Sequence, residues 1–238
     1  IRYGNEKTLD YLKSSNLDTP YAIQLFGFSL ENTIPAIKKI EEVATYDFLD
    51  LNFGCPVEKV VKTGAGSKWL KDVPGLENYV REIVKVSSKP VTAKIRLGWD
   101  EDSINVYEVA EALERAGVAL ISIHCRTRAQ FYSGKARYEE IQDMKKHIKI
   151  PYAASGDIFT PVDAKNALDI THADFVMVAR GGLGHPYLLT QINEYLTNGV
   201  LLSSPSKVKQ IEYAKEFAYA LIKEKGEYIG TRELRGLL

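Results

Sequence analysis

The stretch Phe48-Leu49-Asp50-Leu51-Asn52-Phe53-Gly54 is a short apolar run that ends in glycine, and Cys55-Pro56 follows it directly. A run of this length that ends at glycine and proline predicts a buried β-strand. Because side chains alternate along a strand, Asn52 shares a face with Gly54, opposite the leucines and the phenylalanine. The strand therefore presents an amide away from its aliphatic side chains, and a thiol follows at its end.

The segment after this strand, residues 57–66, has no clean hydrophobic period and contains Gly64 and Gly66. Such a segment is typical of a loop, and we expect it to move over a site.

Five further strand-like runs alternate with helical patterns, which predicts a parallel sheet. The six runs are residues 22–27, 48–54, 91–98, 120–126, 152–155 and 175–180. Polar residues at the strand ends predict an α/β fold of the TIM (β/α)8-barrel type that lacks its first strand and most of its second in this chain. We expect Ile1–Tyr3 to be a remnant of that second strand. A doubly wound open sheet is the alternative.

Two connecting helices carry clear end signals. Asp102 or Ser103 is placed to cap the first helix, and Gly117 stands where a C-terminal glycine belongs. The apolar face of this helix is expected to consist of Val106, Val109, Ala110 and Leu113. The second helix is expected to begin at Thr160, with Asp163 completing a capping box.

The character of the chain changes near residue 203. Residues 203–206 predict a linker, and residues 208–225 predict an amphipathic helix. We expect residues 1–202 to form an N-terminally incomplete barrel and residues 203–238 to begin a truncated helical domain. Since the chain starts at Ile1 without an initiator Met, we also expect it to begin inside a domain.

The composition is that of a globular protein. The 238 residues are 45% hydrophobic, and 31 basic residues balance 31 acidic ones, so net charge gives no long-range attraction to a polyanion. No apolar run reaches the length of a membrane helix. Cys55 and Cys125 are too few for a disulfide framework. We expect a cytoplasmic protein without membrane association or a bound metal ion.

Four cationic or potentially cationic side chains share the strand face opposite the aliphatic residues: Lys94, Arg96, His124 and Arg126. Buried charges need either carboxylate partners or an anionic ligand. A structural ion-pair network explains them without a ligand. These side chains are expected at the end of the barrel where active sites form, and this position favours an anionic ligand.

Glycine-containing turns follow the last two strands. They are Ser155-Gly156-Asp157 and Arg180-Gly181-Gly182-Leu183-Gly184. Exposed N–H groups and an arginine at this place in a barrel indicate a phosphate site. The spacing matches neither the Walker pattern nor G-x-G-x-x-G, which favours a mononucleotide-type phosphate. A simple tight connection is the alternative.

Single residues allow simpler interpretations. Gln24 lies within an apolar strand, where its amide either contacts a heterocycle or bonds to the backbone. Cys55 alone is compatible with an inert buried thiol. Two groups of lysines are either solvated or contact a phosphate backbone: Lys59, Lys62 and Lys68, and Lys145, Lys146 and Lys149.

Taken together, four motifs closely resemble the tRNA-dihydrouridine synthases over nearly the whole chain. They are residues 49–56 with 62–66, Lys94-Ile95-Arg96-Leu97-Gly98, residues 124–128 and residues 155–158. The first is specific for the family, whereas the phosphate turns also occur in other flavin barrels such as dihydroorotate dehydrogenases. The chain departs from the family in having Ala179 before Arg180, where glycine is usual, and in lacking the family's N-terminal strand.

The resemblance implies an FMN enzyme that uses NADPH to reduce the C5=C6 bond of uridines in tRNA. It implies a TIM barrel followed by a helical tRNA-binding domain. The implied flavin contacts are Gln24, Lys94 and His124, with Ser155, Gly156, Asp157, Ala179 and Arg180 at its phosphate. The implied contacts of a flipped-out uracil are Asn52, Arg96 and Tyr132. Cys55 is implied as the acid, since thiols are mostly protonated at neutral pH.

Two other functions remain open. The first is an FMN enzyme that acts on a free pyrimidine or another small enone. The second is a flavin-free barrel that binds RNA without chemistry.

Overall fold

The computed structural model describes residues 6–14 and 19–235. The expected strand remnant Ile1–Tyr3 lies outside the described residues. Contacts divide the chain into two compact units. The first contains Ile1–Gly156 with Ala167–Met177, and the second contains Asp157–Asn166 with Val178–Leu238.

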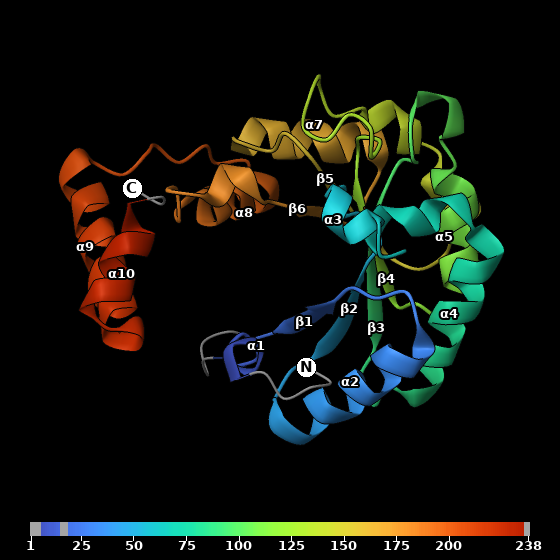
Figure 1. The fold of residues 1–238 in the computed structure, drawn as a ribbon. Helices are drawn as coiled ribbons and strands as arrows, with labels where there is room; N and C mark the ends of the chain where they lie inside the picture. The colour runs from blue at the N-terminus through green and yellow to red at the C-terminus, as the bar shows by residue number, and fades with distance from the viewer. Residues whose placement is uncertain (1–5, 15–18, 236–238) are drawn as a thin grey trace. The chain divides into compact units, whose positions relative to one another are not determined.

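The first unit contains a six-stranded parallel sheet (Figure 1). The strands are β1 (Ala22–Leu25), β2 (Phe48–Asn52), β3 (Val91–Arg96), β4 (Leu120–His124), β5 (Tyr152–Ser155) and β6 (Phe175–Met177). Their order in the sheet is their order in the chain, and every neighbouring pair is parallel. A doubly wound sheet must reverse its strand order at one point, so this sequential order rules it out and confirms the predicted barrel class.

The two faces of the sheet differ in chemistry. One face carries Leu49, Leu51, Ala93, Ile95, Ile121 and Ile123, each at most 2% exposed. The register places the polar residues of the other face in three levels. These are Gln24 with Asp50 and Thr92, then Asn52 with Lys94 and Ser122, then Arg96 with His124 and Ser155. The predicted alternation is therefore confirmed.

Amphipathic helices pack on the apolar face. They are α2 (Leu30–Val43), α4 (Val73–Val86) and α5 (Val106–Arg115). The first unit also contains the short helices α1 (Glu6–Asp10), α3 (Glu58–Val61) and α6 (Met144–His147) and the 3-10 turns η1 (Gly66–Lys71), η2 (Glu101–Ser103) and η3 (Tyr138–Ile141). Figure 1 shows α2, α4 and α5 on the same side of the sheet. Asp72 caps the N-terminus of helix α4, because its side chain accepts a hydrogen bond from the N–H of Gly75 at 3.0 Å.

Five of the six strands end two or three residues earlier than predicted, and only β5 has the expected bounds. The reason is visible at β2. Gly54 and Cys55 donate their N–H groups to the side chain of Asn52 and not to a neighbouring strand. Side-chain acceptors thus end the ladder where the apolar pattern still continues.

The two helix predictions have different outcomes. The predicted start at Asp102 or Ser103 is wrong, because Ser103 and Asp100 close a capping box around η2 and the helix α5 begins at Val106. Its predicted apolar face is fully buried. Helix α7 (Pro161–Thr171) begins as expected, with reciprocal bonds between Thr160 and Asp163.

The segment after β2 is more regular than predicted. It holds the short helix α3, and η1 follows at once. Residues 57–66 are therefore only partly a loop, because the N–H groups of residues 60–62 find carbonyl partners four or three residues earlier.

The second unit contains η4 (Arg180–Gly182), α8 (Leu188–Asn198), α9 (Lys207–Lys225) and α10 (Glu227–Leu234). Ser206 caps α9 by accepting from the N–H of Lys209 at 3.3 Å, so the predicted helix is confirmed, and residues 203–206 precede it without regular secondary structure. The second unit also takes in Asp157–Asn166, upstream of residue 203. A domain boundary after residue 202 stays a prediction.

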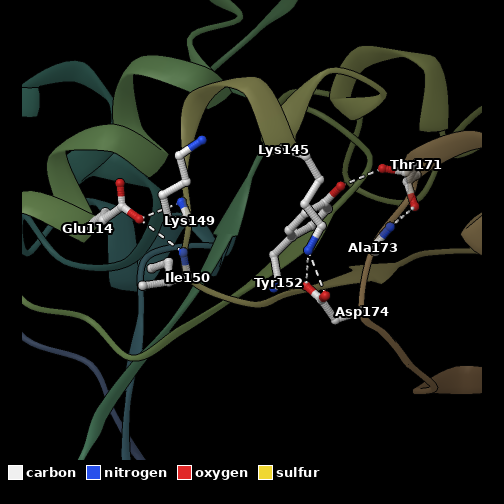
Figure 2. A network of polar contacts seen from close by, with 8 residues as sticks. All are labelled: Glu114, Lys145, Lys149, Ile150, Tyr152, Thr171, Ala173 and Asp174. Carbon is white, nitrogen blue, oxygen red and sulfur yellow. Dashed lines mark hydrogen bonds and ion pairs between the residues drawn. The ribbon is translucent and has the colours of Figure 1, made fainter.

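Polar contacts fix the entry to β5 (Figure 2). Asp174 accepts from the N–H of Tyr152 at 3.0 Å and pairs with the ammonium of Lys145 at 2.5 Å. The Tyr152 hydroxyl donates to the carbonyl of Thr171 at 2.5 Å. Lys145 is thus paired with a carboxylate at the entry to β5, and its phosphate contact stays a prediction.

Within the described ranges, no helix combines the length and the apolar character needed to cross a membrane.

Val109 of α5 is 0% exposed and Val43 of α2 is 48% exposed. The same Val→Ala substitution at the two helix positions therefore isolates the effect of burial on stability. Val109→Ala is expected to lower the free energy of unfolding by about 2 kcal/mol, because it removes buried methyl groups. Val43→Ala is expected to change it by less than about 0.5 kcal/mol. Urea unfolding followed by circular dichroism measures both. Equal losses would contradict the packing of α5 on the sheet.

Candidate active site

A chain of hydrogen bonds runs along the inner face of β1–β3. Asp50 accepts from Thr92 Oγ1 at 2.6 Å and from Gln24 Nε2 at 2.6 Å. Gln24 Oε1 accepts from Asn52 Nδ2 at 2.8 Å. Asn52 Oδ1 then accepts from the backbone N–H groups of Gly54-Cys55 at 3.0 and 2.8 Å. Three strands thereby hold the backbone of the candidate acid.

The groups at the two ends of this hydrogen-bond chain determine which atoms donate and which accept along it. An ionised carboxylate such as Asp50 can only accept, which turns the Gln24 amine toward it. The backbone N–H groups at the other end can only donate, which turns the Asn52 oxygen toward Cys55. The two amides therefore have one consistent orientation. Burial raises the pKa of Asp50, while hydrogen bonds from Gln24 and Thr92 oppose that shift.

Cys55 is half-buried, and its carbonyl is held as firmly as its N–H. Ser67 donates to the Cys55 oxygen twice, from its N–H at 3.1 Å and from its hydroxyl at 2.9 Å. Gly66 makes this approach possible, because it has a φ of +61° and a Cβ there would lie 2.8 Å from the Cys55 oxygen. The thiol therefore projects from a backbone bonded on both sides.

The two arginines of the cationic group bond to main-chain carbonyls. Arg96, 2% exposed, donates to the carbonyls of Gly54, Thr127 and Phe131 at 2.8–2.9 Å. Arg126, 1% exposed, donates to the carbonyls of Ser133 and Gly134 at 3.1 and 2.8 Å. Sequence reasoning offered carboxylates or an anionic ligand, whereas carbonyl dipoles satisfy much of both guanidinium groups.

Lys94 is different, because its ammonium forms no hydrogen bond or ion pair with the part of the chain that the structure describes. Burial and, after it, the charge of Arg96 lower its pKa from an ordinary 10.5 to about 8, while Cys125 and Asp50 act in the opposite direction. A cation in this state favours an anionic group beside it.

His124 lies against the turn after β5. A Cβ on Gly156, whose φ is +121°, would come within 3.1 Å of the His124 ring. Arg126 approaches His124 Nε2 at 3.4 Å. Since a guanidinium can only donate, Nε2 accepts and the proton of a neutral ring resides on Nδ1. Tyr132 is 51% exposed, and its ring centroid lies 6.1 Å from that of His124.

The predicted phosphate residues fall in both compact units. In the second unit Arg180 pairs with Asp157 at 3.1 Å, and its guanidinium lies 5.7 Å from the centre of the Phe159 ring. Ala179 is exposed beside them. In the first unit Ser155 is 5% exposed. The roles of these residues, and those of the other predicted site residues, stay predictions.

Sequence reasoning missed three residues that position this site: Asp50, Thr92 and Ser67. A signal for Asp50 was present, because it lies two residues before Asn52 and therefore on the same strand face. Ser67 carried no such signal, since only the fold brings it to the Cys55 carbonyl. Among the described residues, no group of three or more His, Cys, Asp or Glu side chains is arranged to hold a metal ion.

The sequence matches a known protein family over almost its whole length. The family model described as "Dihydrouridine synthase (Dus)" matches residues 1–237. The chain belongs to this family.

Individual relatives carry the same family name. A probable tRNA-dihydrouridine synthase of Rickettsia bellii (strain RML369-C) is 39% identical over 90% of this chain and 65% of its own length. A probable tRNA-dihydrouridine synthase 1 of Synechocystis is 37% identical over 88% of this chain and 59% of its own length. The tRNA-dihydrouridine synthase B of Shewanella oneidensis is 36% identical over 99% and 78%. The chain thus spans less than two thirds of the first two relatives.

Solved structures share the fold at low identity. Histamine dehydrogenase from Rhizobium sp. 4-9 superposes with a TM-score of 0.52 at 15% identity, over 69% of this chain and 27% of that protein. 6-Hydroxypseudooxynicotine amine oxidase from Pseudomonas geniculata N1 superposes with a TM-score of 0.50 at 13% identity, over 72% and 30%.

Replacing Asp50 tests the hydrogen-bond chain. Asp50→Val removes both acceptors and leaves the Gln24 amine unpaired, so we expect faster hydrogen exchange at the Cys55 amide and a loss of about 1–3 kcal/mol in unfolding free energy. Asp50→Asn keeps an acceptor for Gln24 and serves as the control, with exchange at Cys55 close to that of the original protein. Equal exchange in both variants would contradict a continuous chain.

Replacing Lys94 tests its unpaired charge through pH. Because its folded pKa, about 8, lies below its ordinary 10.5, the unfolded state binds more protons between these values and stability rises with pH. We expect Lys94→Met to exceed the original ligand-free protein in stability by about 3 kcal/mol at pH 7, at about 1.4 kcal/mol per pKa unit, and by much less at pH 10.

The comparison isolates Lys94 from other groups that titrate in this range. The buried Cys125 thiol, whose pKa burial raises to about 12, acts in the opposite sense in both proteins. Lys85→Met, at an exposed lysine paired with Glu82, is the control and should show no such pH dependence. Parallel stability curves for Lys94→Met and the original protein, from urea unfolding, would refute a depressed Lys94 pKa.

Proposed function

We propose that this protein reduces uridine in tRNA to 5,6-dihydrouridine, with FMN as cofactor, NADPH as reductant and Cys55 as the proton donor. Family membership supports the reaction. The observation that carries the assignment of Cys55 is the hydrogen-bond chain that ends on its N–H, beside the unpaired Lys94 on the same strand face.

The residues present are compatible with a flavin. Lys94 supplies a buried positive charge without a direct protein partner, which suits the electron-rich N1 and O2 edge of a reduced isoalloxazine. Gln24 keeps one N–H beyond its bond to Asp50, and His124 lies beside the Gly156 turn. FMN, when bound and reduced by NADPH, supplies the hydride that adds to C6 of the uracil.

Cys55 completes the reduction at the neighbouring carbon. As the C6–H bond forms, the electrons of the C5=C6 bond move toward C5 and O4. The Sγ–H bond of Cys55 then breaks, a C5–H bond forms, and the thiolate left behind regains a proton from water. The bonds from Asn52 and Ser67 to the Cys55 backbone keep Sγ in one place during this transfer.

Asn52, Arg96 and Tyr132 are proposed to hold the uracil. Asn52 retains one N–H beyond its bond to Gln24, and this N–H can donate to a uracil carbonyl. The guanidinium of Arg96 lies 5.8 Å from the centre of the Tyr132 ring, and the exposed ring offers a surface for a base. Because a stacked base is out of reach, the target nucleotide must be extruded.

The phosphate of FMN is proposed to bind at the turns after β5 and β6, through Ser155, Gly156, Asp157, Ala179 and Arg180. The pairing of Arg180 with Asp157 supports this, because it holds a guanidinium at the turn where it can exchange a carboxylate oxygen for a phosphate oxygen.

The two cysteines allow a matched test. Cys55→Ala is expected to lower dihydrouridine formation on tRNA by about 10²–10⁴-fold, the usual contribution of a general acid, while reduction of the bound flavin by NADPH continues. Cys125→Ala, on the opposite strand face, is expected to keep both activities. Product is measured in tRNA by mass spectrometry and flavin reduction by absorbance.

Three results would reject parts of the proposal. Unchanged product with Cys55→Ala would remove Cys55 as the acid. Reduction of free uracil or orotate without activity on tRNA would change the substrate class. Protein purified without any flavin, and unable to bind it, would remove the chemistry.

A further inference from the structure

Three cationic side chains gather around the indole of Trp99. The guanidinium carbon of Arg128 lies 4.5 Å from the ring centre, Lys71 Nζ lies at 4.7 Å and Lys68 Nζ at 5.6 Å. Each distance is within the range of a cation–π contact. Three positive charges thus lie close to one aromatic ring.

These charges have no anionic partner within hydrogen-bond reach. In the described ranges, the side chains of Lys68, Lys71 and Arg128 form no hydrogen bond or ion pair, and Arg128 Nε is buried without a partner. Many other basic residues are neutralised, as in the pairs Lys62–Glu58, Arg137–Glu101, Lys145–Asp174 and Lys146–Asp143. Of the lysines singled out in the sequence, only Lys68 joins a cluster of unpaired cations around an aromatic ring.

The neighbouring carboxylates are already engaged. Glu58, which senses the charge of Arg128, is ion-paired with Lys62 at 3.0 Å. Asp72 caps helix α4 at the N–H of Gly75. Asp100 accepts from the hydroxyl of Ser103 at 2.5 Å. Glu58 therefore offsets part of the charge of Arg128, but none of these carboxylates forms an ion pair with Lys68, Lys71 or Arg128 in the described ranges.

The cluster belongs to the end of the sheet that carries the candidate active site. Lys68 and Lys71 lie in η1, whose Ser67 bonds to the carbonyl of Cys55. Trp99 follows β3, and its carbonyl accepts from the N–H of Ala129 at 2.9 Å. The loops after β2, β3 and β4 thus meet here.

We propose that Trp99, Lys68, Lys71 and Arg128 form a binding site for the phosphodiester backbone of RNA, beside the nucleotide that enters the active site. This inference rests on the proposed function for the identity of the RNA. Ammonium and guanidinium groups bind phosphate oxygens, and the indole holds the three cations together and offers an edge to a ribose or base.

The salt dependence of tRNA binding tests this site. We expect Lys68→Gln/Lys71→Gln to weaken tRNA binding by about 10–100-fold and to reduce the slope of log K against log salt by about 1.4–1.8, since each phosphate contact contributes about 0.7–0.9. Lys38→Gln/Lys89→Gln removes two exposed, unpaired lysines elsewhere in the first unit and should leave affinity and slope unchanged. Filter binding at salt concentrations between about 50 and about 200 mM measures both the affinity and the slope.

The outcomes separate the two proposals. An unchanged slope in Lys68→Gln/Lys71→Gln, with dihydrouridine still formed by the original protein, overturns the phosphate site and leaves the function standing. A reduced slope in a protein that forms no dihydrouridine keeps the site and overturns the function. Equal losses of tRNA affinity and slope in the cluster and control variants would show that net charge alone explains the effect, and would also overturn the site.

Tryptophan fluorescence provides a second readout that needs no enzymatic activity. The sequence has two tryptophans, and Trp69 stacks on Tyr79 with ring centres 4.7 Å apart. The signal lost in Trp99→Phe identifies the contribution of Trp99. That contribution should be quenched more by iodide than by caesium, and an RNA oligonucleotide should protect it. Preference for caesium, or no protection by RNA, would contradict the site.

Discussion

The hydrogen bonds from Asn52 Oδ1 to the N–H groups of Gly54 and Cys55 are the constraint on which the candidate site depends. They end the β2 ladder and orient the thiol at the same time. Asn52 can do this because Gln24 and Asp50 hold its amide from the neighbouring strands. The site is therefore preorganised by the sheet, which loses little freedom when a substrate binds.

Positive charge at the inner face is handled in two ways. Arg96 and Arg126 are stabilised by loop carbonyls, so they order the segments that follow β2 and β4, and the segment after β4 carries Tyr132. Lys94 has no such partner and keeps a lowered pKa. On this face, two cations are bonded to carbonyls and Lys94 is unpaired among the described residues, which favours an anionic group near Lys94.

Much of the fold was predictable, because it depends on short-range patterns. Alternation in Leu49, Asp50 and Leu51 predicts which face is buried, and Thr160 with Asp163 predicts a helix start. The strand ends and the start of α5 were not predictable. Asp100 and Ser103 cap a 3-10 turn because Ile104 bridges back to Gly98, and that contact depends on the sheet.

The amino-acid sequence by itself determined the barrel class and the polar strand face, since both follow from periodicity and residue type along the chain, and it indicated the candidate thiol through the resemblance to a family. Only the tertiary structure decided the partners. It brought Ser67 to the Cys55 carbonyl, gave Arg96 its carbonyls, and gathered Lys68, Lys71 and Arg128 on Trp99. Hydrogen bonds and charge–charge distances act through space, and a linear pattern does not specify which distant groups will meet.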